Sequence, residues 1–175
     1  MDQKSGNDND RLARGMVLLA WAAALLFGAW LYQQQLDRRD NPNRDLSTEP
    51  GIGGVREVVL LRNAQGHYVA DGFIDGHPAT FLLDTGATTV AIPEALARRW
   101  GLRLRPGGYS QTANGVVPVW RTRLASVRLG AIELHDVSAV VMPSMAAEAD
   151  VLLGMSFLKH VELVQRDGRL LLRQP

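Results

Sequence analysis

The sequence predicts an all-β, barrel-like domain with one or two short helices, preceded by an N-terminal transmembrane helix. Three observations lead to this prediction: many short apolar or alternating segments, glycine-containing turns between them, and one uncharged apolar run near the N-terminus. The 175 residues are enough for one domain with its own core. We expect a disordered tail at 1–14, a membrane anchor at 15–32, a flexible tether at 33–54 and the folded domain at 55–175.

Composition excludes several classes of function. The net charge is +1, so no strong field favours nucleic acid or acidic partners. The chain has no cysteine, which excludes disulfides and cysteine-based zinc sites. No two of the histidines have the spacing of metal ligands, and no phosphate-binding loop is present, so a metal hydrolase or nucleotide enzyme is disfavoured. We expect no metal and no cofactor. The histidines are His67, His77, His135 and His160.

The apolar run Met16–Tyr32 carries no charge and is near the lower length limit for a membrane-spanning helix. A buried soluble helix would show a polar face, which this run lacks. A cleaved signal peptide would have a shorter apolar region followed by a small-residue cleavage site, but Gln33–Gln35 follows here. An uncleaved anchor is therefore the favoured interpretation. Basic residues are balanced on its two sides, although those before the run lie nearer and mildly favour a cytoplasmic N-terminus.

The two segments that flank the run are polar. Residues 1–14 mix charges with Asn, Gly and Ser, which is typical of disorder. Residues 33–54 contain Asp, Arg, Asn, Pro and Gly with few apolar positions, which favours a tether between membrane and domain.

The domain begins with three predicted strands, Val58–Leu61, His67–Ile74 and Ala79–Leu83, the last two joined by a hairpin turn at Asp75-Gly76. The third strand ends on an acid, within the sequence Phe81-Leu82-Leu83-Asp84-Thr85-Gly86-Ala87. Burying a lone carboxylate there would be costly unless the site uses it. Strand-like composition returns directly afterwards, so the unit is strand, acidic loop, strand.

The rest of the chain continues the β pattern. One short helix is predicted from the proline at its first turn and the glycine just past its end, and a second helical turn follows the last apolar-apolar-glycine motif. Two further hairpins are expected around Asn114-Gly115 and Asp167-Gly168. The predicted helices are Pro93–Trp100 and Met155–His160, and the predicted strands are Tyr109–Ala113, Val116–Trp120, Arg123–Leu129, Ile132–Val140, Glu162–Gln165 and Leu170–Arg173.

Two motifs carry a resemblance to a known family. Leu82-Leu83-Asp84-Thr85-Gly86-Ala87 resembles the active-site loop of aspartic proteases, and Asp150–Leu158, with Leu152-Leu153-Gly154, resembles the element that closes the same fold. From about Gly66 to its end, the chain is similar to bacterial membrane-anchored, retroviral-like (retropepsin-type, clan AA) aspartic proteases. The resemblance implies a single-lobe barrel. It also implies catalytic roles for Asp84, Thr85 and Gly86, and a substrate-binding flap at Thr112-Ala113-Asn114-Gly115.

The chemistry of peptide hydrolysis argues for two chains. It needs a base that activates water and an acid that protonates the leaving group, and one carboxylate cannot conveniently do both. The other Asp-Gly pairs, Asp71-Gly72, Asp75-Gly76 and Asp167-Gly168, lack the hydroxyl residue and are interpreted as turns, and Asp150 as structural. The partner of Asp84 is then Asp84 of a second copy. We expect a homodimeric aspartic endopeptidase acting on peptides or proteins, single-pass in a bacterial inner membrane, with a periplasmic domain.

One departure from the retroviral pattern concerns the termini. In retroviral proteases the chain ends help to form the dimer interface, whereas this N-terminus leads into a tether and a predicted membrane span. Two other classes of function stay open. The domain could be a binding or scaffold module that kept the fold and lost proteolysis, or a membrane-tethered protein whose hairpins pair with a partner strand. An Asp84→Asn variant with unchanged activity would favour either of them.

Overall fold

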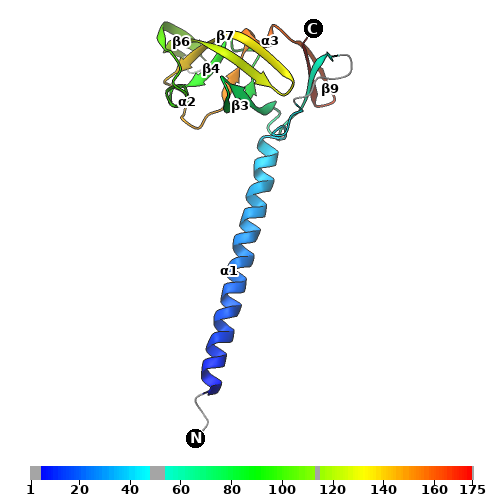
Figure 1. Ribbon diagram of the computed structural model, residues 1–175, viewed down its shortest axis with the longest axis vertical. Coiled ribbons are helices and arrows are strands. Elements are labelled where there is room, and N and C mark those ends of the chain that lie inside the picture. The colour runs from blue at the N-terminus through cyan, green and yellow to red at the C-terminus, as the bar shows by residue number, and fades with distance from the viewer. Residues whose placement is uncertain (1–4, 48–53, 113–114, 175) are drawn as a thin grey trace. The chain divides into compact units, whose positions relative to one another are not determined.

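The computed structural model describes residues 5–47, 54–112 and 115–174. The chain forms two compact units, Met1–Arg39 and Asp40–Pro175 (Figure 1). A single helix, α1 (Ser5–Asp40), makes up the described part of the first unit, and the second unit is built mainly from β-strands. The structure confirms the predicted all-β domain with short helices.

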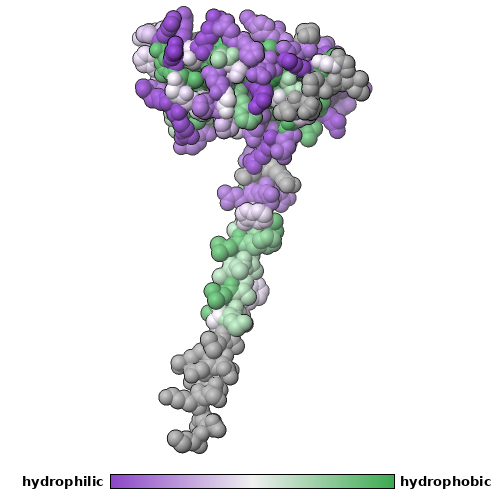
Figure 2. All heavy atoms as spheres, in the orientation of Figure 1, coloured by the Kyte–Doolittle hydropathy of each residue, from purple (hydrophilic) through white to green (hydrophobic). Residues whose placement is uncertain are grey.

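Helix α1 is longer than the sequence analysis predicted. It includes residues 5–14, which were expected to be disordered, and residues 33–40, which were expected to belong to the tether. Residues 33–40 contain no glycine or proline and consist mostly of Gln, Leu and Arg, which favour helix, so the helix can continue through them. It ends at Asp40, two residues before Pro42, because a proline disfavours helical backbone in the residue that precedes it. Figure 2 shows apolar residues gathered along the middle of α1. Within the described part of the chain, no helix combines the length and the apolar character that crossing a membrane requires.

The segment that follows α1 belongs to the β domain. Asn41 and Asn43 are buried, and Asn43 forms an isolated parallel bridge with Ala70. The Asn43 side chain donates to the carbonyl oxygens of Leu61 at 2.9 Å and Val69 at 2.7 Å, and accepts from the Leu61 N–H at 2.7 Å. Residues 41–47 therefore differ from the flexible tether that was predicted. Residues 48–53 of that tether lie outside the described residues.

The strands form two sheets. Six strands close into a barrel in the order β2-β3-β8-β4-β7-β6, because β6 also pairs with β2, and β5 extends the sheet beyond β6. A separate three-stranded sheet has the order β1-β10-β9. The strands are β1 (Arg56–Leu61), β2 (Val69–Ile74), β3 (His77–Leu83), β4 (Val90–Pro93), β5 (Arg105–Thr112), β6 (Gly115–Leu129), β7 (Ile132–Met142), β8 (Val151–Leu153), β9 (Glu162–Arg166) and β10 (Arg169–Gln174).

Turn chemistry fixes two of the hairpins as predicted. Asp75-Gly76 and Asp167-Gly168 both have positive φ at their two positions, as a type I′ turn requires. The turn predicted at Asp71-Gly72 is wrong, because both residues lie inside β2. Gly72 is needed there for a different reason. A Cβ on it would lie 2.3 Å from the Arg128 carbonyl oxygen, where β2 approaches β6.

The two strands predicted at Val116–Trp120 and Arg123–Leu129 form one continuous strand, β6. Its first half pairs with β5 and its last residues pair with β2, so the two partners share one edge of β6. Alternate residues of β4 face opposite sides of the sheet. Val90 and Ile92 join the main core, which also takes up Ala97 from α2 (Glu94–Arg99) and Phe157 from α3 (Met155–Leu158), whereas Ala91 faces a smaller apolar cluster.

Candidate active site

Asp84 lies where β3 ends, beside the end of β8. The two strands run parallel, with Leu83 opposite Leu153, and the Asp84 N–H donates to the Leu153 carbonyl oxygen at 3.2 Å. Asp84 is half-buried, and Thr85 and Gly86 are exposed. The expected burial of the acid is therefore wrong in degree. Asp84 lines a cleft and is partly accessible to solvent.

Backbone N–H groups hold the loop around this acid. The Gly86 N–H donates to Asp84 Oδ1 at 2.8 Å, and the Ala87 N–H donates to the Asp84 carbonyl oxygen at 3.2 Å. The first bond orients the carboxylate, and the second closes a tight turn behind it. Gly86 suits this position because a Cβ there would lie 3.1 Å from Asp84 Oδ1.

The closing element predicted at Leu152-Leu153-Gly154 contacts the acidic loop directly. The Met155 N–H donates to the Ala87 carbonyl oxygen at 2.8 Å. A Cβ on Gly154 would lie 2.3 Å from the Thr89 carbonyl oxygen and 2.6 Å from that of Ala87, so only glycine allows this approach. The two sequence motifs therefore form one packed unit.

Ser156 also supports the loop, and the sequence analysis missed it. Its Oγ accepts a hydrogen bond from the Val90 N–H at 2.9 Å, which ties the start of β4 to the start of α3. The available signal was a hydroxyl residue two positions after the glycine of the closing element, where an Oγ can reach a neighbouring backbone group.

A cleft of about 540 Å³ opens beside Asp84. Apolar side chains form part of its lining, here called the apolar wall, and the end of the β5–β6 hairpin also lines it, so the hairpin and the acid border the same space. Sequence reasoning missed the apolar wall, because its residues come from strands far apart in the chain. The lining residues are Asp84, Gly86, Ala87, Thr88, Thr89, Ala91, Ser110, Gln111, Thr112, Val117, Val140, Met142, Ser144, Met145 and Leu152.

Two of the four residues of the predicted flap, Thr112 and Gly115, are described, and both belong to this hairpin. Thr112 lines the cleft and pairs with Gly115, and its Oγ1 donates to the Gly115 carbonyl oxygen at 2.8 Å. Gly115 is the first residue of β6 and has φ of 104°. Ala113 and Asn114 lie outside the described residues.

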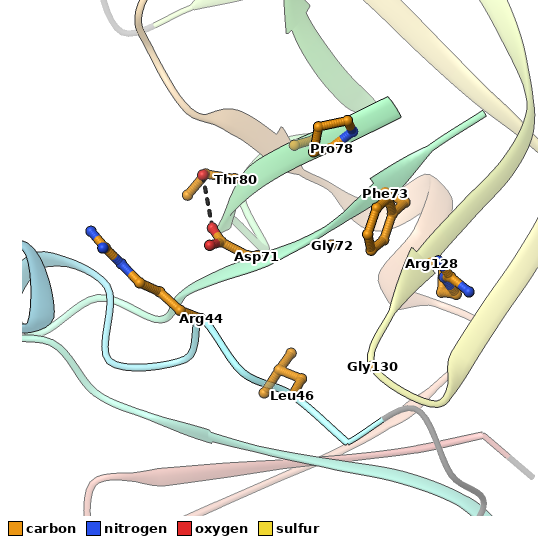
Figure 3. A pocket seen from close by; sticks show the side chains of 10 residues that line it. Arg44, Leu46, Asp71, Gly72, Phe73, Pro78, Thr80, Arg128 and Gly130 are labelled. Carbon is orange, nitrogen blue, oxygen red and sulfur yellow. Dashed lines mark hydrogen bonds between the residues drawn. The ribbon is translucent and has the colours of Figure 1, made fainter. Parts of the chain in front are cut away.

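A second cavity, of about 380 Å³, is lined in part by residues from the start of β3, and Asp84 is not among its lining residues (Figure 3). Its acid is Asp71, whose Oδ1 accepts hydrogen bonds from Thr80 Oγ1 at 2.8 Å and Asn41 Nδ2 at 2.7 Å. On the opposite side, the Arg128 guanidinium lies 4.5 Å from the centre of the Phe73 ring. The bond from Asn41 connects the segment 41–47 to β2, and the bond from Thr80 connects β2 to β3, which indicates a structural role for Asp71.

Asp150 belongs to the same region. The pKa of the Asp150 carboxyl is raised above its ordinary value, mainly by partial burial and to a lesser extent by repulsion from the Asp71 carboxylate. Across residues 5–47, 54–112 and 115–174, no group of three or more His, Asp or Glu side chains is placed to hold a metal ion.

Comparison with known proteins places this geometry in a family. Residues 70–160 match the family described as "gag-polyprotein putative aspartyl protease". An uncharacterized protein from the cobV 5′ region of Sinorhizobium sp is 32% identical over 64% of this chain and 49% of its own length. An uncharacterized protein of Rickettsia prowazekii (strain Madrid E) is 29% identical over 75% of this chain and 54% of its own length. The chain thus spans about half the length of both relatives.

A solved structure supports the same relationship. The crystal structure of a retropepsin-like aspartic protease from Rickettsia conorii aligns with a TM-score of 0.59 at 27% sequence identity, over 69% of this chain and 92% of that one. The family match covers the acidic loop, the β5–β6 hairpin and the closing element together. The chain therefore belongs to the gag-polyprotein aspartyl protease family and has the retropepsin-type fold.

Proposed function

We propose that this protein is an aspartic endopeptidase that hydrolyses peptide bonds in polypeptide substrates. The observation that carries the proposal is the position of Asp84. Its carboxylate is oriented by the Gly86 N–H and lies in a cleft that is lined by the apolar wall and by the end of the β5–β6 hairpin. An extended peptide could place its side chains against the apolar wall while its backbone passes the acid.

The active species in this proposal is a homodimer. Among the described residues that line the cleft, Asp84 is the single acidic residue. One carboxylate cannot serve as base and acid in the same step, so a second Asp84 from another copy has to complete the site across a two-fold axis. Thr85 and Gly86 are exposed beside Asp84, where a partner loop could approach them.

The two carboxylates would divide the chemistry. Two acids in contact cannot both ionise cheaply, so the pair shares one proton. The ionised Asp84 takes a proton from water as the water attacks the peptide carbonyl carbon. The protonated Asp84 donates its proton to the carbonyl oxygen, and a proton then passes to the leaving amine as the C–N bond breaks.

The direct test is turnover of a diverse peptide mixture by the wild type and by Asp84→Asn. Asparagine keeps an oxygen that can accept the Gly86 hydrogen bond, so the loop should hold its shape while the reaction loses its base. We expect turnover to fall by at least about a thousandfold, because both carboxylates of the pair change. Asp167→Asn is the matched control in the β9–β10 turn and should keep full activity. Equal turnover in Asp84→Asn and wild type would favour the scaffold interpretation instead.

We also propose that the run Met16–Tyr32 anchors the protein in a bacterial inner membrane, with the β domain in the periplasm, although no described helix meets the length and hydropathy of a membrane span. The exposure of consecutive apolar residues supports this. Leu25, Leu26 and Phe27 point about 100° apart around α1 and are 71%, 73% and 59% exposed. Apolar side chains on every side of a helix need an apolar surrounding.

Alkaline washing of membranes tests the anchor. We expect the full-length protein to stay in the membrane fraction with its N-terminus intact. Recovery of a soluble protein that begins near residue 33 would show a cleaved signal peptide and contradict the anchor. In intact spheroplasts, added protease should reach the β domain, and full protection of that domain would contradict the periplasmic orientation.

A further inference from the structure

A row of residues crosses five strands of the large sheet on one face. Leu152 of β8 is opposite Ala91 of β4, Ala91 is opposite Val140 of β7, Val140 is opposite Arg121 of β6, and Arg121 is opposite Arg105 of β5. Residues directly opposite one another project to the same face of a sheet. The first three line the cleft beside Asp84. The cleft wall therefore continues into Arg121 and Arg105.

These two arginines, here called the arginine pair, are an unusual combination. Like charges directly opposite each other on neighbouring strands destabilise a sheet. Both side chains are exposed, and neither forms an ion pair with another described residue. Arg123, two residues further along β6 on the same face, is instead neutralised by Asp136 at 2.7 Å. The arginine pair thus leaves an uncompensated positive charge next to the cleft, although the net charge of the chain is only +1.

Distance connects this charge with the cleft. Neighbouring strands lie about 4.8 Å apart, so the Arg121 backbone is about one strand spacing beyond the cleft residue Val140 and Arg105 about two. From Leu152, whose neighbour Leu153 bonds the Asp84 backbone, Arg121 is three strands away, or about 14 Å. An extended peptide advances about 3.3 Å per residue, so a side chain about three to five residues from the scissile bond could reach the arginine pair.

We propose that the arginine pair is an outer subsite that selects substrates with an acidic residue about three to five positions from the scissile bond. The inference rests on the proposed protease function and names the class of substrate it takes. The apolar wall receives the side chains near the bond, and the arginine pair receives an Asp or Glu carboxylate farther along the same peptide. A carboxylate there relieves the repulsion between the two guanidinium groups as it binds.

Cleavage of a proteome-derived peptide library by the full-length protein in detergent tests this inference. The wild type should show enrichment of Asp and Glu at one outer position. At that position, a Glu peptide should exceed its Gln counterpart in kcat/KM by about threefold to tenfold, the range that two exposed charge pairs supply. The preference should shrink as ionic strength rises, because salt screens exposed charges.

The variant R105Q/R121Q should lower the Glu-to-Gln ratio of kcat/KM to about one while still cleaving the Gln peptide. Removing two repelling charges should not impair folding. The control Arg99→Gln changes one exposed arginine on α2, a helix that packs on the opposite face of β4, and should keep the full preference. Charge reversal in R105E/R121E should turn the preference toward Lys over Gln at the same position.

The outcomes separate the two proposals. If the wild type cleaves no peptide, or cleaves equally well as Asp84→Asn, the protease function fails. If it cleaves peptides through Asp84 but shows no acidic enrichment at any outer position, or if the enrichment survives in R105Q/R121Q, the outer subsite fails. If R105Q/R121Q instead loses binding to anionic phospholipid vesicles without any change in peptide preference, the arginine pair binds a membrane surface. That result would also overturn the outer subsite.

Discussion

Gly154 shows how a single residue late in the chain positions the acid at Asp84. A Cβ there would meet two backbone oxygens of the acidic loop, at 2.3 and 2.6 Å, and backbone cannot yield as a flexible side chain can. We therefore expect Gly154→Ala to lower the free energy of unfolding by about 3 kcal/mol. Urea denaturation measures the loss. We also expect the folded fraction to have reduced turnover, because the loop has to move.

Gly66→Ala is the control for this prediction. Gly66 has φ of 90° and open space around its Cβ position. Alanine there should lower the free energy of unfolding by about 1 kcal/mol, because a Cβ disfavours positive φ, and should leave turnover unchanged. If Gly154→Ala is no more destabilising than Gly66→Ala, the close approach does not constrain the loop.

At the residue scale, the sequence identified those site residues whose neighbours along the chain reveal them. Asp84 is recognisable because an apolar strand leads into Asp-Thr-Gly-Ala, and Gly154 because two leucines precede it. Ser156 and the arginine pair were not recognisable, because their significance depends on partners 66 positions away in the first case and on strand register in the second. The degree of burial of Asp84 likewise depends on the packing of distant strands.

The segment 41–47 is the element that departs most from its predicted role. Its composition is typical of a tether, yet the Asn43 side chain fills three hydrogen-bonding positions at the ends of β1 and β2. We expect Asn43→Ala to lower the free energy of unfolding by about 3 kcal/mol, since it leaves one buried and two partly buried backbone groups without their partner. Asn63→Ala, in an exposed loop, should cost only about 1 kcal/mol. Equal losses in thermal or urea unfolding would show that 41–47 is only loosely attached.

The β5–β6 hairpin is an element in which we expect a substitution to reduce turnover more than stability. Gly115 has φ of 104°, which a β-branched residue tolerates poorly, but nothing crowds its Cβ position. We expect Gly115→Val to reduce kcat/KM by about tenfold or more while shifting Tm little, because the strain falls on a hairpin that lines the cleft. Gly168→Val places the same strain in the β9–β10 turn, away from the cleft, and should leave kcat/KM unchanged. Turnover at the wild-type level in Gly115→Val would remove the hairpin from the site.

Local chemistry decided which elements could be predicted. The Asp75-Gly76 and Asp167-Gly168 turns, the helix after Pro93 and most strands follow from residues that are close in sequence. The merging of two predicted strands into β6 could not be predicted, because one edge of β6 is shared by two partners, β5 and β2, and β2 lies far from β6 in the chain. The pairing of β1 with β10, near opposite ends of the domain, is likewise set by tertiary contacts that no local pattern encodes.

At the scale of the whole molecule, the central claim is that one chain holds half of an active site. The described cleft contributes one acid, and the proposed chemistry needs two. Membrane anchoring would favour pairing by confining copies to a surface and so raising their local concentration. For the purified protein, activity per chain should therefore fall on dilution below the dimer dissociation constant.

Mixing of chains tests this claim most directly. Wild-type and Asp84→Asn chains are combined at fixed total concentration, allowed to exchange, and assayed for peptide cleavage. A shared pair of Asp84 carboxylates predicts activity that follows the square of the wild-type fraction, so an equal mixture should retain about one quarter of the wild-type rate. Activity strictly proportional to the wild-type fraction, in a protein that sediments as a monomer while it cleaves peptide, would contradict the account.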